Sequence, residues 1–269
     1  MAQDLILTGL GANAPAILAG RTNTLADSLA QGIAGQSFDK LSIRASRFRI
    51  IENGVEVHVS GELSMNAVMI GSQAHHSRVF YLNGWDEEAE RTRPDCFSRD
   101  GVTPAADAPL KQSSTCSSCL RNVKGSGRDG RGKACSYKKR IVIVPRASLQ
   151  EGALPKVYAF DVNGKSIFGE GVPGKNLFSL SGYAKFLSTR RQGFPTGVFP
   201  QTLETTISFN TDESVPAVLF SPAMSQDGRA VSWLTEPEYT RAFELGATEQ
   251  VKLMLSMSAA DTSDAEGGA

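Results

Sequence analysis

The residues VEVHVSGELSMNAVM, numbers 55–69, carry the clearest structural pattern in this sequence. Apolar residues from Val55 to Met69 occupy the odd positions, interrupted only by Gly61, and polar residues occupy most even positions. Because successive side chains of a strand point to opposite faces, this alternation predicts one long amphipathic strand, bent at Gly61. Asn53 and Gly54 precede the strand and are a strong hairpin signal.

The flanking sequence extends this pattern into a β-rich domain. Residues 41–50 alternate with a slip near Arg47, and residues 77–82 read as a further strand, so the chain begins as an antiparallel meander. Further expected elements are a buried strand at 141–144, a hairpin over 156–168 around Asn163 and Gly164, a helix within 175–191, a strand pair at 202–209 and 215–220, and a helix over 238–257 with a potential break at Gly246. We expect an α+β, β-rich fold, with an antiparallel OB-like barrel or meander sheet and a C-terminal helix.

Composition limits the classes of protein that this chain can belong to. Its 269 residues are 41% hydrophobic, which is too apolar for a disordered chain and enough to bury a core. With 28 basic and 28 acidic residues its net charge is zero, so nucleic-acid binding would need a local patch. The uncharged stretch 5–20 is too short to span a bilayer, so we expect a soluble cytoplasmic protein. We expect an N-terminal arm at 1–40, one domain at 41–258 with an insertion at 86–139, and a short acidic tail at 259–269.

The expected insertion contains all four cysteines and too few large apolar residues to build a core. Cys96, Cys116, Cys119 and Cys135 follow the spacing C-x19-C-x2-C-x15-C, which is typical of a structural Cys₄ zinc knuckle. A zinc ion would supply the cross-link that the segment lacks. Three other interpretations stay open: unrelated buried cysteines, a redox CxxC pair and an iron–sulfur cluster. No histidine lies in the segment, which argues against a catalytic zinc.

The same insertion is strongly basic. Residues 111–140 carry nine Lys or Arg against one acid, Asp129, and such a patch is typical of phosphate binding, although a solvated basic loop is the simpler alternative. The candidate nucleic-acid-binding residues are Arg121, Lys124, Arg128, Arg131, Lys133, Lys138, Lys139 and Arg140, with Tyr137 and Trp85 for base stacking and Arg44, Arg47 and Arg49 on the outer face of the first strand. We find neither a Walker loop nor a nucleophile–base set, so we expect no enzymatic activity.

Three stretches around the cysteines carry a family resemblance: DCFSRDG (95–101), QSSTCSSC (112–119) and GKACSYKKR (132–140). Together they resemble a motif of uncharacterised bacteriophage proteins with a Cys₄ zinc-knuckle insertion, which are similar to phage single-stranded DNA-binding proteins. The resemblance implies a replication or transcription accessory, with DNA binding on an OB-like barrel and the four cysteines as metal ligands. Leu120 departs from it, because many of those proteins have proline at that position.

These observations lead to one principal functional hypothesis. We expect a sequence-independent single-stranded DNA-binding protein of a bacteriophage, with structural Zn²⁺, acting in replication, recombination or transcription. Its partners would be single-stranded DNA and replication or transcription proteins, in the host cytoplasm and without a membrane. The alternatives are a protein-binding adaptor, such as a polymerase cofactor or an inhibitor of a host factor, and a virion component.

Overall fold

The computed structural model describes residues 38–83, 93–128, 130, 132–189, 195–211, 217–258, 260 and 261. The chain divides into two units, Met1–Gln36 and Ser37–Ala269. The expected N-terminal arm lies outside the described residues up to residue 37. None of the helices in the described ranges is long and apolar enough to cross a membrane.

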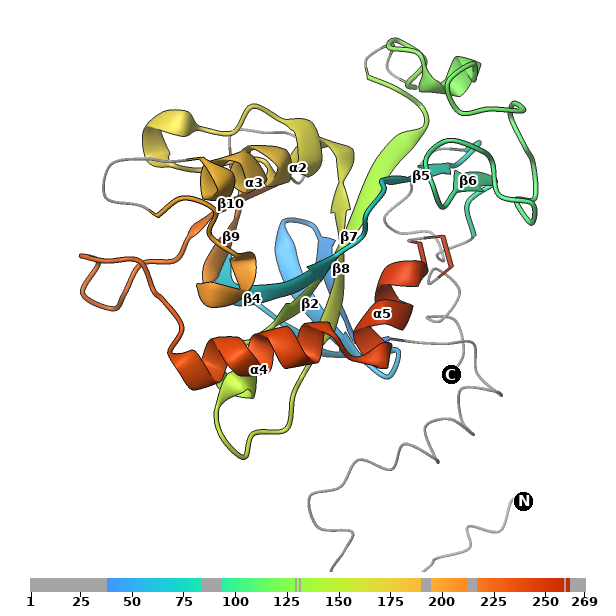
Figure 1. Ribbon diagram of the computed structural model, residues 1–269. Coiled ribbons are helices and arrows are strands. Elements are labelled where there is room, and N and C mark those ends of the chain that lie inside the picture. Colours follow the sequence, from blue (N-terminus) through green and yellow to red (C-terminus); the bar gives the residue numbers. More distant parts are fainter. Residues whose placement is uncertain are drawn as a thin grey trace, which may run out of the picture. The chain divides into compact units, whose positions relative to one another are not determined.

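Ten strands in the described part of the chain form one mixed sheet (Figure 1). They are β1 (Lys40–Arg44), β2 (Arg47–Glu52), β3 (Val55–Val59), β4 (Ser64–Ser72), β5 (Ser77–Phe80), β6 (Cys96–Ser98), β7 (Ser136–Val144), β8 (Tyr158–Asn163), β9 (Thr205–Phe209) and β10 (Val218–Pro222). Eight of them follow the order β10-β9-β4-β7-β8-β1-β2-β3 in a curled half-barrel, while β5 pairs with β6 and β7. The α+β class is as expected, but the OB-like barrel is not confirmed. The sheet is also not wholly antiparallel, because β1 runs parallel to β8.

The predicted long strand over 55–69 is two strands in the structure. β3 pairs with β2, whereas β4 pairs with β7 and β9, so the chain changes partners between residues 60 and 63. The two strands also differ in burial: all five residues of β3 are exposed, and Ala67–Ile70 of β4 are buried. The strand conformation is as predicted, but the single amphipathic strand is wrong, because the side-chain period does not show which strand is the neighbour or which face is covered.

β7 is the central strand, since it pairs with β4, β5 and β8. Ile141 and Ile143 belong to one apolar cluster, and Val142 and Val144 belong to another. Both faces of β7 are therefore buried at this end. Helix α3 (Leu180–Ser188) contributes to the first cluster, and helices α4 (Glu236–Gly246) and α5 (Glu249–Ser256) contribute to the second. Figure 1 shows these helices on opposite sides of the sheet.

Most expected helices are present, and one expected hairpin is not. α3 is shorter than the predicted range, and the break at Gly246 is confirmed, since α4 ends there against the Ile70 carbonyl. The hairpin around Asn163 and Gly164 is wrong. Asn163 ends β8, and its side chain accepts a hydrogen bond from the Ser166 amide, which caps helix α2 (Gly164–Phe168). Asparagine favours helix caps as well as hairpin turns, and here the cap forms.

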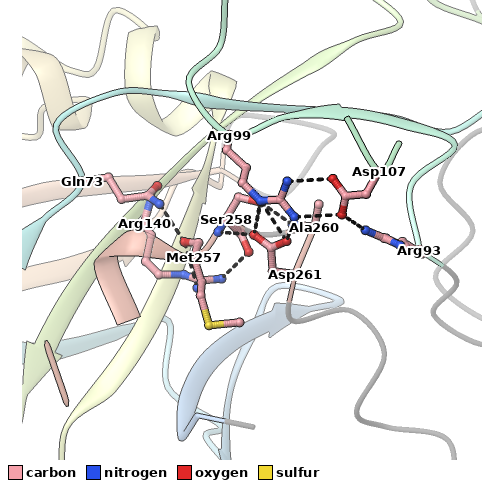
Figure 2. A network of polar contacts seen from close by, with 9 residues as sticks. All are labelled: Gln73, Arg93, Arg99, Asp107, Arg140, Met257, Ser258, Ala260 and Asp261. Atoms are coloured by element: carbon pink, nitrogen blue, oxygen red, sulfur yellow. Dashed lines mark hydrogen bonds and ion pairs between the residues drawn. The ribbon is translucent and has the colours of Figure 1, made fainter. Parts of the chain in front are cut away.

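A polar network ties the C-terminal segment to the centre of the sheet (Figure 2). The Arg140 side chain on β7 is only 1% exposed, and its Nη2 lies 2.7 Å from Asp161 Oδ2. Its guanidinium also donates to the carbonyls of Met254, Met257 and Ser258. Burial by itself would raise the pKa of the Asp161 carboxyl, but the Arg140 charge lowers it below its usual range. The prediction that Arg140 contacts nucleic acid is therefore wrong, because its side chain is buried and its charge is paired with Asp161 inside the fold.

A second arginine extends this network to the segment that follows β5. Arg99 pairs with both Asp107 and Asp261, and Arg93 also pairs with Asp107. Ala260 is buried in a small apolar cluster with Val79, Phe97 and Ala108. Residues 260 and 261 are the two described residues of the expected acidic tail. They pack against residues 96–135, which we call the cysteine-containing segment.

We predict that Arg140→Met destabilises the protein by about 3–5 kcal/mol, because it leaves the Asp161 carboxylate half-buried without its partner. Urea unfolding followed by circular dichroism measures the loss. Lys252→Met is the matched control, because Lys252 pairs with Glu249 on the surface, where such pairs contribute little. Equal stability of the two variants would show that Arg140 does not hold the C-terminal segment.

Candidate nucleic-acid interface

The four cysteines come from three segments of the chain and line one pocket. Cys96 begins β6 and pairs with Phe80 of β5. The Cys116 amide donates to the Val102 carbonyl, and Cys119 precedes a short 3₁₀ turn. The Cys135 amide donates to the Arg121 carbonyl just before β7 begins. The backbone therefore brings together the four residues that the spacing singled out.

The thiols are free and largely buried. Cys96, Cys116 and Cys119 are buried, and Cys135 is half-buried. Burial raises the pKa of Cys116, and it raises that of Cys135 to about 11, while the Arg78 charge opposes both shifts. In the described ranges, no group of three or more His, Cys, Asp or Glu side chains is placed to hold a metal ion. The cysteines share a pocket without a ligand arrangement, so the metal site stays a prediction.

Arg78 on β5 is a member of this site that the sequence analysis missed. Its side chain is buried, and its Nε donates to the Gly101 carbonyl over 3.0 Å. Nη1 donates to Asn122 Oδ1 over 2.6 Å and Nη2 to the Tyr137 hydroxyl over 2.5 Å. The guanidinium carbon lies 4.0 Å from the centre of the Tyr137 ring. In the sequence, Arg78 is one charged residue in a strand, which is the usual appearance of an exposed position.

Asn122, also absent from our candidates, connects the pocket to a predicted cation. Its Nδ2 donates to the Cys116 carbonyl over 2.8 Å. Its Oδ1 accepts from Lys133 Nζ over 3.0 Å as well as from Arg78. One amide side chain therefore links a cysteine, a buried cation and an exposed one.

The predicted cations of the insertion divide into exposed and partly buried groups. Arg121, Lys124, Arg128 and Lys133 are exposed, whereas Lys138 and Lys139 on β7 are half-buried. The Arg121 guanidinium lies 5.2 Å from the centre of the Phe80 ring. Arg131 and Trp85 lie outside the described residues.

Three aromatic rings gather at the start of β7, and we call them the stacking platform: His76, Tyr137 and Phe168. The Phe168 ring centre lies 5.0 Å from that of His76 and 5.3 Å from that of Tyr137, and Phe168 is 51% exposed. Lys133 Nζ lies 5.6 Å from the Tyr137 ring centre. Burial lowers the pKa of His76, and the Lys139 and Arg78 charges lower it further, which favours a neutral imidazole at pH 7.

Only Tyr137 of this platform was among the sequence candidates. Phe168 was assigned to a strand, because the Asn163–Gly164 pair was read as a hairpin turn. Its actual place at the end of α2 follows from the Asn163 cap. His76 was not a candidate, because no local pattern shows that its ring meets two aromatic side chains from distant segments.

The three arginines of the first two strands do not form one group. Arg44 and Arg47 are exposed and face each other across the β1–β2 turn, whereas Arg49 pairs with Glu56. Because β1 is parallel to β8, Arg44 at the carboxyl end of β1 lies at the same end of the sheet as Asn163. The stacking platform also lies at that end, where β8 leads into α2 and β7 begins.

We predict that Asn122→Ala loosens the cysteine pocket locally, because three side-chain hydrogen bonds are lost. The expected cost is about 1–3 kcal/mol, seen as faster hydrogen exchange at the Cys116 and Cys135 amides. Gln112→Ala is the control, since Gln112 lines the same pocket but makes only exposed bonds, to the Leu110 carbonyl and from Arg121, and, among the described residues, none to a cysteine or to Arg78. Unchanged exchange in Asn122→Ala would show that the amide does not organise the pocket.

Comparison with protein-family models, curated proteins and solved structures finds no match to this chain. The function proposed below therefore rests on the geometry of the pocket, the cations and the stacking platform, together with the motif around the cysteines.

Proposed function

We propose that this chain binds single-stranded DNA without strong sequence preference, and that it is a binding protein and not an enzyme. The observation that carries this proposal is the stacking platform. The exposed Phe168 ring is held by the His76 and Tyr137 rings, which are tilted to it by 43° and 77°, and it can offer its face to an unpaired base. Stacking on such a ring tolerates any base. In a duplex the bases are already stacked on one another, so the same surface would favour single strands.

Cations near this platform would supply the attraction for phosphates. Lys133 lies over the Tyr137 ring, and Arg44 and Arg47 lie at the same end of the sheet. The exposed Arg121, Lys124 and Arg128 extend the positive surface over the cysteine-containing segment. Because the net charge of the chain is zero, this local excess must provide the counterion-release term of the affinity.

A structural zinc ion at the four cysteines is the second part of the proposal. The apolar cluster of this segment is small, with Val79, Phe97, Ala108 and Ala260 as its buried members. Such a cluster contributes little folding free energy, and a tetrathiolate zinc would add a cross-link between its segments. Binding would require the four thiols, which already line one pocket, to turn toward a common centre. An iron–sulfur cluster on the same thiolates would be recognised by its visible absorption.

The biological setting is proposed from the sequence resemblance. We assign the activity to replication, recombination or transcription of a bacteriophage, in the host cytoplasm. The curled sheet would serve as the scaffold that an OB-like barrel provides in other single-strand binders.

Exposed apolar residues favour a second candidate, docking of another protein on the insertion. Leu120 is 80% exposed and Val123 is 55% exposed, next to the same cations. Side chains of this kind are common at the centre of protein interfaces. An adaptor of this kind would keep its zinc and its fold but would not bind an oligonucleotide.

Fluorescence anisotropy with labelled oligo-dT tests single-strand binding directly. We predict that Phe168→Ala weakens binding by about 1–3 kcal/mol, which is about 5- to 150-fold in Kd, because one stacked base loses its surface. Phe199→Ala is the matched control, since Phe199 is also an exposed phenylalanine but packs against Phe243 of α4.

Wild-type binding should weaken as salt is raised, and duplex DNA should compete poorly. If the wild-type protein does not bind oligo-dT at low salt, the proposal of single-strand binding is wrong and protein docking is favoured. Equal oligo-dT affinities for Phe168→Ala and wild type would show that the stacking platform is not part of the DNA interface.

We predict that removing the metal with a chelator unfolds the cysteine-containing segment, β6 included, without unfolding the rest of the sheet. Hydrogen exchange of the full chain should become faster across residues 96–135 and stay slow in β8, and single-strand affinity should fall with it. Restoring Zn²⁺ should reverse both changes. Identical exchange before and after chelation, with no metal in the purified protein, would rule out a structural metal.

A further inference from the structure

The Arg78 guanidinium is a buried cation whose recorded partners are all neutral. It donates to a backbone carbonyl at Gly101, an amide oxygen at Asn122 and a hydroxyl at Tyr137. Among the described residues, no carboxylate forms an ion pair with it. A buried charge is costly unless an opposite charge compensates it. The surroundings of Arg78 therefore lack a negative counter-charge.

The cysteine pocket, which Arg78 lines, is where such a counter-charge can form. Arg78 lines the pocket together with the four cysteines, and Asn122, which accepts from Arg78 Nη1, donates to the Cys116 carbonyl. Neutral thiols offer no counter-charge. Four thiolates around a divalent cation, by contrast, keep an excess of two negative charges, which a fixed guanidinium nearby would stabilise.

We infer that Arg78 is the buried counter-cation of a tetrathiolate metal centre formed by Cys96, Cys116, Cys119 and Cys135. It is a positioning residue, because it acts on the charge of the centre without being a ligand. Asn122 and Gly101 hold it in place, and Gly101 itself has no room for a Cβ, which would lie 2.4 Å from the His76 carbonyl oxygen. The inference rests on the metal part of the proposed function and is independent of DNA binding.

Cobalt titration of the full-length, metal-free chain tests this inference. Co²⁺ bound by four thiolates gives sulfur-to-cobalt charge-transfer bands and tetrahedral visible bands, and competition with Zn²⁺ gives the zinc affinity. Arg78→Met should weaken metal binding by about 10- to 100-fold, the usual range for partners outside the ligand set. Arg78→Lys loses the same fork of hydrogen bonds but keeps the charge, so it should restore most of the affinity. Arg121→Met is the matched control, because Arg121 lines the same pocket but is exposed.

Each outcome separates the inference from the proposals it depends on. Wild-type affinity in Arg78→Met would overturn the role of Arg78 while leaving the metal centre intact. Equal weakening in Arg78→Met and Arg78→Lys would assign the effect to lost hydrogen bonds and overturn the charge argument. No tetrathiolate spectrum in the wild type would overturn the metal centre and the inference together, whereas oligo-dT binding would still report on the stacking platform. If circular dichroism shows that Arg78→Met is unfolded, Arg78→Gln, which keeps one donor, replaces it.

Discussion

The contact between Arg140 and the end of α5 is the interaction on which the rest of this structure depends. β7 joins the two halves of the sheet, and Arg140 lies where that strand passes beneath the C-terminal helix. Its guanidinium satisfies three carbonyls at the open end of the helix and the Asp161 carboxylate of β8. Because both faces of β7 carry apolar clusters, fixing this strand also fixes the layers on either side. The cysteine pocket and the stacking platform both lie at its beginning.

Arg78 and Arg140 show how one residue type serves two purposes on paired strands. Both are buried, and both use all their guanidinium nitrogens. The charge of Arg140 is compensated by the Asp161 carboxylate, whereas the described hydrogen-bond partners of Arg78 are neutral. Sequence alone grouped Arg140 with the exposed cations and gave Arg78 no role, because burial is a property of the assembled sheet. The charge on Arg78 is intelligible only once the cysteines beside it are considered as possible anions.

Local patterns predicted the elements well and their partners poorly. The apolar run at 141–144 and the helix break at Gly246 have their expected local structure. The slip expected near Arg47 is instead a tight turn at Ala45 and Ser46 between β1 and β2, and the long strand expected over 55–69 is two strands. The parallel pairing of β1 with β8 joins residues more than a hundred positions apart, and no local pattern encodes it. The site divides in the same way. The cysteine spacing predicted four residues that line one pocket. The aromatic rings around Phe168 meet because α2 forms, and α2 forms because Asn163 caps a helix and does not turn a hairpin.

The long separation between Arg140 and its helix carbonyls has a consequence for biosynthesis. The carbonyl partners of Arg140 follow it by 114 to 118 residues, so they leave the ribosome well after β7 has been made. Until then, one face of the central strand carries a cation and apolar side chains that α4 and α5 have yet to cover. Contacts of such high sequence separation form slowly, and exposed strands of this kind are the ones that aggregate. The nascent chain is therefore most vulnerable after the sheet can begin to pair and before the last helix is released, which is the interval in which a chaperone would be of most use to it.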